Sequence, residues 1–144
     1  MAITSAICNS FKVEILTATH NFTASSGNTF NLALYTSSAT LNKSTTAYTT
    51  SSEVASSGGY TAKGKALTSV TPALSSSTAV CDFANISWTS ASFTANGCLI
   101  FNDSATGDPA VCVIAFGGDK VVTNGTFTIE FPAADSSNAI LRIA

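Results

Sequence analysis

Charge is the scarcest property of this chain. Of 144 residues only 6 are Lys or Arg and 8 are Asp or Glu, which leaves a formal net charge of −2. The basic residues are scattered, whereas a nucleic-acid-binding surface needs clustered positive charge, so we expect no nucleic-acid partner. A surface with so little charge keeps copies of a protein poorly separated, which suits a protein that works inside an assembly.

Long apolar runs are also missing. None approaches the ~20 residues that a membrane-spanning helix needs, so we expect no membrane partner. The N-terminal sequence MAITSAICNSFK has neither a basic leader nor a long apolar core. It therefore predicts no signal peptide and synthesis in the cytoplasm.

Residues suited to catalysis are few. His20 is the single histidine, with no acid or nucleophile beside it in sequence. It could act as a general base, but we favour a helix-exit residue bonded to backbone. No P-loop, GxSxG or HExxH pattern occurs, and nothing in the sequence supports Asp82 with Glu130 as a glycosidase pair. The sequence predicts no enzyme and no cofactor.

The cysteines lack the CxxC spacing of a zinc site. Two of the four, Cys98 and Cys112, lie on consecutive predicted strands around the turn Asp103–Asp108 and could be nearly opposite each other. They are either buried free thiols, which we favour, or a disulfide formed after release from the cell. The turn itself resembles a calcium loop only faintly, because it lacks alternating oxygen ligands and a terminal Glu. We predict an Asp/Asn-rich turn and no metal.

What the chain does have is strand-forming residues, including nine Phe. Between Gly97 and Phe131, two dense apolar runs and one alternating run predict three consecutive strands, an antiparallel meander. These runs are Cys98–Phe101, Ala110–Phe116 and Phe127–Phe131. Turns are expected between them, in the sequence GGDK and at Asn124-Gly125.

The same signals predict strands elsewhere and one short helix, Phe11–Ala18, capped by Ser10. The further strands are Thr29–Thr36, Tyr60–Leu74 with a bend near Pro72, Ala79–Ala84, Ile86–Thr89 and Ala139–Ile143. About eight or nine short strands with frequent turns predict an all-β fold. We expect one domain over residues 1–144, an antiparallel β-sandwich of jelly-roll-like form with one short N-terminal helix.

Two segments stand apart from these strands. Residues 1–9 predict an apolar N-terminal arm or edge strand, packed on a neighbouring subunit or under its own sheet. Residues 37–59 predict a long polar surface loop, pinned by Leu41, Tyr48 and Val54. Four aromatic residues interleaved with hydroxyls could form a sugar-binding face, although we favour core and interface anchors. They are Tyr35, Tyr48, Tyr60 and Trp88.

Four segments carry a resemblance to a known family. They are FKVEILTATHNF (Phe11–Phe22), TFNLALYTSSATLNKSTTAYTTSSEVASSGGYTAKGKAL (Thr29–Leu67), ISWTSASFTANGCLIFND (Ile86–Asp103) and FPAADSSNAILRIA (Phe131–Ala144). Through them nearly the whole chain resembles a family of small structural proteins of tailed bacteriophages, common in marine and cyanobacterial phages. Where that family has Gly before the His, this chain has Ala18. Its SSEVASSGGY segment is slightly expanded, and its cysteines are particular to it.

The resemblance implies a virion structural protein. Its leading form is a capsid decoration or cement protein, a trimeric homo-oligomer that binds the major capsid protein or other virion proteins. The alternative is a tail, neck or fibre component, which could be a host-glycan-binding adhesin. A trimer would bury the N-terminal arm and part of the long loop, so the interface candidates are Ile3, Ile7, Tyr48, Val54 and Tyr60.

Overall fold

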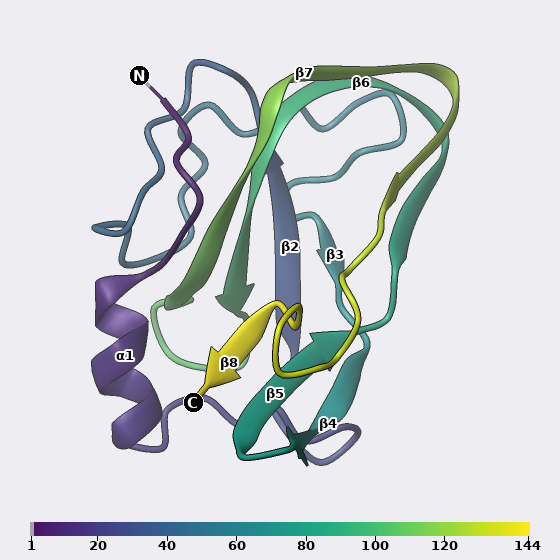
Figure 1. The fold of residues 1–144 in the computed structure, drawn as a ribbon. Coiled ribbons are helices and arrows are strands. Elements are labelled where there is room, and N and C mark those ends of the chain that lie inside the picture. Colours follow the sequence, from purple (N-terminus) through teal and green to yellow (C-terminus); the bar gives the residue numbers. More distant parts are fainter. Residues whose placement is uncertain (1) are drawn as a thin grey trace.

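The computed structural model describes residues 2–144 and is an all-β fold with one short helix (Figure 1). Strands form two antiparallel sheets, one of five strands in the order β1-β7-β6-β2-β3 and one of three in the order β4-β5-β8. This confirms the predicted fold class. The elements are β1 (Ala6–Ile7), α1 (Asn9–Leu16), β2 (Phe30–Tyr35), β3 (Lys65–Ala66), β4 (Ser69–Ser75), β5 (Thr78–Phe83), β6 (Ile86–Asn102), β7 (Ala110–Ile129) and β8 (Leu141–Ile143).

The fold is organised around a long antiparallel ribbon of β6 and β7, which are 17 and 20 residues long. In Figure 1 the ribbon rises through the middle of the molecule, arches over and descends on one side. The predicted three-strand meander is therefore wrong, because the alternating run Phe127–Phe131 starts in the second half of β7. The sequences GGDK and Asn124-Gly125 do not form the predicted turns. They lie inside β7, at points where its pairing register with β6 shifts.

Bulges let β7 continue through these turn-like sequences. Ala95 pairs with Lys120 and Gly97 pairs with Ala115, so residues 116–119 of β7 bulge outward opposite a single residue of β6. Gly117 and Gly118 have φ of 77° and 145°, which glycine adopts without the clash of a Cβ. Asn96, which is followed by Gly97 in β6, is the single residue opposite this bulge.

Strand β2 lies between β6 and β3 in the five-stranded sheet, and all of its residues are buried. The alternation of the sequence indicated one buried face. The second face is buried because the chain from residue 37 to residue 64 folds back over it. On that face the Tyr35 hydroxyl donates to the carbonyl of Thr49 at 2.7 Å, and Asn31 Nδ2 donates to the carbonyl of Lys63 at 3.2 Å.

The helix α1 begins and ends two residues earlier than predicted. Its N-cap is Cys8, which makes no side-chain capping bond, rather than Ser10. Phe11 is buried as expected, but Leu16 is 87% exposed. Before the helix, β1 pairs with Val113 and Cys112 of β7, so Ala6–Ile7 of the N-terminal arm form an edge strand of its own sheet. Earlier in the arm, Ile3 forms a parallel bridge with Leu41 of the long loop. Among residues 2–144 no helix is long and apolar enough to cross a membrane.

The predicted extended segment Tyr60–Leu74 divides between the two sheets. Its β3 part pairs with β2, and its β4 part pairs with β5 in the other sheet. A register shift between Val70 and Ala73 gives the expected bend at Pro72. The last strand, β8, pairs with β5, but it is an edge strand and only its first residue, Leu141, is buried. The strand predicted at Ala139–Ile143 is therefore found two residues shorter, and its last two residues are exposed.

Candidate functional site

The long loop is held on β2 by one carboxylate. Glu53 Oε1 accepts hydrogen bonds from the Tyr60 hydroxyl at 2.6 Å and from the Lys63 backbone N–H at 2.8 Å, and Oε2 accepts one from the Tyr48 hydroxyl at 2.5 Å. The Leu34 N–H of β2 donates to the Tyr60 hydroxyl oxygen at 2.9 Å. We call Tyr48, Glu53, Tyr60 and Lys63 the Glu53 cluster. It closes residues 48–63 into a fixed unit.

The tyrosine hydroxyls of this region are held neutral. Burial, reinforced by the hydrogen bond to Glu53, raises the pKa of Tyr48 to about 12. Burial and then the same carboxylate raise the pKa of Tyr60 further. Burial also raises the pKa of Tyr35, whose hydroxyl donates to the Thr49 carbonyl at 2.7 Å. These hydroxyls therefore serve as hydrogen-bond donors that anchor the loop.

Lys63 fills the place between the two carboxylates of the Asp103–Asp108 turn. Its Nζ lies 2.9 Å from Asp103 Oδ1 and 2.8 Å from Asp108 Oδ2. These bonds, the one to Asp108 first, raise the pKa of the Lys63 ammonium. The turn thus has an internal cation, contributed by a residue 40 positions away from Asp103. Among residues 2–144 no group of three His, Cys, Asp or Glu side chains is placed to hold a metal ion.

His20 is part of the packed interior. Its Nδ1 lies 3.1 Å from Asn102 Nδ2, which donates to it, so the ring proton is on Nε2 and points to Glu14 Oε1 at 3.1 Å. The His20 side chain is 0% exposed. The expected backbone bond is replaced by these two side chains, which pin the exit of α1 to the end of β6. Sequence reasoning missed Glu14 because it lies six residues away from His20.

The four cysteines are free and buried. Cys98 pairs with Ile114 and Cys112 with Ile100, so the two sulfurs are on diagonal rather than opposite positions of the β6–β7 ribbon. The expectation that they lie nearly opposite is wrong by two residue pairs, because Leu99 and Val113 form the pair between them. Burial raises the pKa of the Cys98 thiol to about 12 and that of Cys112 well above its ordinary value.

The predicted aromatic face is not an open surface. Tyr35, Tyr60 and Trp88 are only 0%, 2% and 3% exposed. Trp88 packs against Phe127 and other rings inside the fold, with a centroid distance of 6.1 Å to Phe127. The sugar-binding interpretation is therefore wrong for these three side chains, and the core-anchor interpretation describes them.

The predicted interface residues are used inside the chain to different extents. Val54 and Tyr60 are 6% and 2% exposed, so little of either side chain is left to contact a neighbour. Ile3, Ile7 and Tyr48 are partly buried against the core. Contact of these three residues with another subunit stays a prediction.

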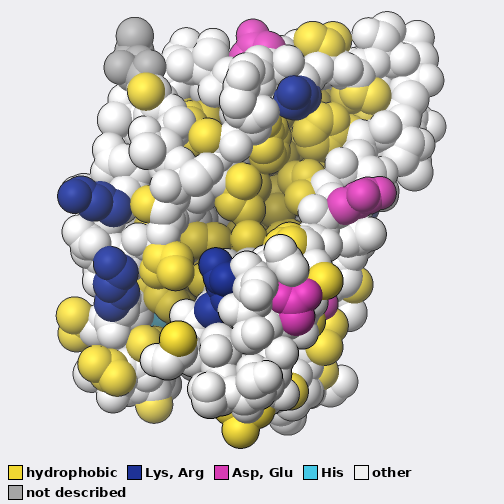
Figure 2. Space-filling view, in the orientation of Figure 1, with side chains coloured by type: hydrophobic (Ala, Val, Ile, Leu, Met, Phe, Trp, Pro, Cys, Tyr) yellow, Lys and Arg dark blue, Asp and Glu magenta, His cyan; other side chains and the backbone are white. Residues whose placement is uncertain are grey.

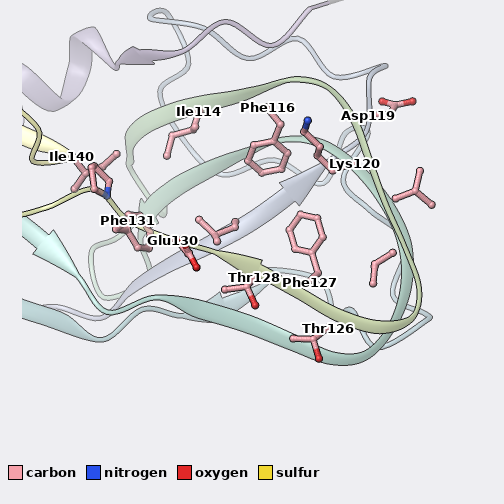
Figure 3. A pocket seen from close by; sticks show the side chains of 14 residues that line it. Ile114, Phe116, Asp119, Lys120, Thr126, Phe127, Thr128, Glu130, Phe131 and Ile140 are labelled. Atoms are coloured by element: carbon pink, nitrogen blue, oxygen red, sulfur yellow. The ribbon is translucent and has the colours of Figure 1, made fainter.

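The structure instead presents an apolar groove that the sequence did not indicate. Its volume is about 630 Å³. Figure 2 shows apolar side chains exposed in a hollow beneath the arch of the ribbon, and Figure 3 shows side chains from both halves of β7 on opposite sides of the opening. The lining residues are Ile114, Phe116, Asp119–Val122, Thr126–Pro132 and Ile140.

An open strand edge runs beside this groove. The outer edge of β7 pairs with β1 only at Cys112 and Val113. From Ile114 to Ile129, no strand of the described chain pairs with that edge. Unpaired backbone N–H and C=O groups along a strand are a template for another strand. The groove and the β7 edge together are the candidate interaction surface.

Comparisons of the chain with protein-family models, with curated proteins and with solved structures each find no match. The phage-protein resemblance of the sequence therefore stays a prediction, and the argument for function rests on the groove and the β7 edge.

Proposed function

We propose that the chain is a structural subunit of a tailed-phage virion, a capsid decoration or cement protein that stabilises the head through subunit contacts. The observation that carries the proposal is the apolar groove beside the unpaired edge of β7. An apolar hollow with a polar rim is the kind of surface that a protein partner covers. An open strand edge adds backbone hydrogen bonds to such a contact.

The use of the polar side chains supports a structural role. Lys63 is paired with Asp103 and Asp108, Glu53 accepts from two tyrosines, and His20 is bonded on both ring nitrogens. These contacts join the loop, the helix and the ribbon into one rigid body. Rigidity favours cementing, because binding then loses little free energy to ordering the protein itself.

A cement protein of this kind acts by mass action. It binds the assembled shell and not the separate shell subunits, so its binding free energy adds to the stability of the shell. Its partners are further copies of itself, proposed from the resemblance as a trimer, and the major capsid protein. No bound cofactor takes part in this mechanism, and the protein is located in the virion.

Immunogold labelling of intact virions, with an antibody raised against this chain, tests the placement. Label over the head supports decoration. Label confined to the tail or its tip overturns it and favours the tail, neck or fibre alternative.

Thermal disruption of heads gives the second readout. Heads stripped of the protein are expected to break at a lower temperature, and adding the purified chain back is expected to restore their stability. Failure of the added chain to bind or stabilise expanded heads contradicts the cement role.

A further inference from the structure

A small polar pocket lies between residues 59–65 and the beginning of β6. The Ser92 N–H of β6 donates to the Gly58 carbonyl at 2.8 Å on one side of it. On the other side the Lys65 ammonium donates to the Ser87 carbonyl. Between these two contacts the chain leaves a volume of about 240 Å³, which suits one small chemical group rather than a folded partner. The lining residues are Gly59, Thr61, Gly64, Lys65, Trp88 and Thr89.

Trp88 presents an unpaired donor at this pocket. The residue is only 3% exposed, and its indole Nε1 is buried without a hydrogen-bond partner among residues 2–144. An indole N–H can only donate, so a buried one calls for an acceptor. The ring otherwise packs against the rings of Tyr60, Phe93 and Phe127. The polar pocket is therefore the side from which an acceptor can reach it.

Lys65 brings a positive charge to the same pocket. Its Nζ lies 5.7 Å from the centre of the Trp88 ring and forms no ion pair within residues 2–144. The bond to the neutral Ser87 carbonyl leaves its other N–H donors free for a ligand. Lys65 is exposed, so its flexible side chain can turn aside and admit that ligand to the indole. No Asp or Glu is among the lining residues to neutralise the ammonium.

We propose that this pocket binds an oxyanion, a sulfate, phosphate or carboxylate group, which accepts hydrogen bonds from the Trp88 indole and the Lys65 ammonium. An oxyanion supplies both the acceptors and the negative charge that the lining lacks, and charge-assisted bonds of this kind are strong. The indole binds through its N–H edge while its ring stays packed in the core, so the contact is not sugar stacking. The pocket shares no lining residue with the groove, so the proposal stands without the role in the virion.

Because Trp88 is the single tryptophan, the test has a specific reporter. A proton–nitrogen correlation spectrum of the isotope-labelled chain contains one indole N–H peak. Replacing sodium chloride by sodium sulfate at constant ionic strength is expected to move this peak downfield, with saturation in the millimolar range. Absence of a saturable shift, even with tens of millimolar sulfate, phosphate or acetate, would overturn the site.

Variants of the lysine separate the site from a general salt effect. Lys65→Met keeps the aliphatic stem beside Trp88 but removes the charge, and it is expected to weaken sulfate binding about tenfold or more. Lys65→Arg keeps the charge and is expected to retain binding. Lys43→Met, at an exposed lysine of the long loop, is the matched control and binds like the original chain. Equal titrations of Lys65→Met and Lys43→Met would exclude the proposed contact.

Dextran sulfate and unmodified dextran distinguish a free anion from one carried by a polymer. An indole shift at a lower concentration of sulfate groups than inorganic sulfate requires assigns the anion to an acidic polysaccharide. Equal concentrations for the two probes assign it to a free ion. In both cases the response must weaken in Lys65→Met. A response to unmodified dextran contradicts the proposal, because that polymer carries no oxyanion.

Discussion

The Tyr60 hydroxyl donates a 2.6 Å hydrogen bond to Glu53 and accepts a 2.9 Å bond from the backbone N–H of Leu34 in β2. This one hydroxyl thereby connects the carboxylate of the long loop to β2, an interior strand of the five-stranded sheet. Loops of this length usually move unless their own side chains fix them. Here the Glu53 cluster fixes residues 48–63 beside β2, in which every residue is buried.

Glu53→Gln is expected to destabilise the protein by about 1–3 kcal/mol. The substitution removes the charge that strengthens the three hydrogen bonds, and it leaves at least one of the buried donors without an acceptor. Glutamine keeps the shape but has one acceptor oxygen for three donors. Chemical denaturation monitored by Trp88 fluorescence measures the change. Glu130→Gln, at an exposed carboxylate, is the control at low protein concentration, and equal stability of the two variants would contradict the anchoring role.

The raised pKa values of the three tyrosines predict a loss of stability at high pH. Burial raises the pKa of Tyr48 to about 12 from the ordinary 10.0, and the pKa values of Tyr35 and Tyr60 are also raised by burial. A group whose pKa is raised in the folded state contributes stability that is fully present below the unfolded pKa and is lost above it. Stability should therefore fall as the pH rises from 10 towards 12. Tyrosinate absorbance checks this: a tyrosine that ionises near pH 10 in the folded protein would contradict it.

Local periodicity accounts for the parts of the fold that were predicted well. Strand β2 was expected at Thr29–Thr36 and is found at Phe30–Tyr35, and β5 was expected at Ala79–Ala84 and is found at Thr78–Phe83. Both are short runs between turns, where neighbouring side chains decide the conformation. β7 differs, because it contains a Gly-Gly sequence that alone would end a strand. The strand continues past this sequence because β7 pairs with β6 on both sides of it.

The candidate surface was not predictable in the same way. Alternation in Phe127–Phe131 indicates which residues share a face, but it does not say which strand lies beside them. The open edge results from β1 pairing with β7 at only two positions, a tertiary relationship. The pairing of Lys63 with Asp103 and of Glu14 with His20 likewise depends on chain segments that the fold brings together.

His20 is expected to contribute stability through its two hydrogen bonds. His20→Phe keeps the aromatic packing against Phe11, which has a ring-centroid distance of 5.0 Å, but leaves Glu14 and Asn102 without this partner. The free energy of unfolding should fall by about 1–3 kcal/mol. Glu14→Gln retains an acceptor oxygen and should change it less. Full stability of His20→Phe would show that packing alone explains the residue.

The thiols are expected to be protected in the folded protein. All four are buried, and burial raises the pKa of Cys8 to about 11 and that of Cys81 to about 12, so the reactive thiolate is scarce. A chromogenic disulfide reagent should react slowly with the native chain and with four thiols after denaturation. Two reactive thiols in denatured protein taken from virions would instead reveal a disulfide formed after release.

Ala18 offers a stabilising substitution at the end of α1. Its φ is 60°, a left-handed conformation that disfavours a Cβ. The Thr19 N–H bonds to the Glu14 carbonyl at 3.0 Å and the Ala18 N–H to the Ile15 carbonyl at 3.4 Å, the Schellman pattern in which glycine is preferred at this position. Ala18→Gly should therefore raise the free energy of unfolding by about 0.5–1 kcal/mol. Ala133→Gly, at an exposed alanine without positive φ, should be neutral or destabilising. If both substitutions destabilise equally, the conformational strain at Ala18 is already relieved by the bonds to Glu14 and Ile15.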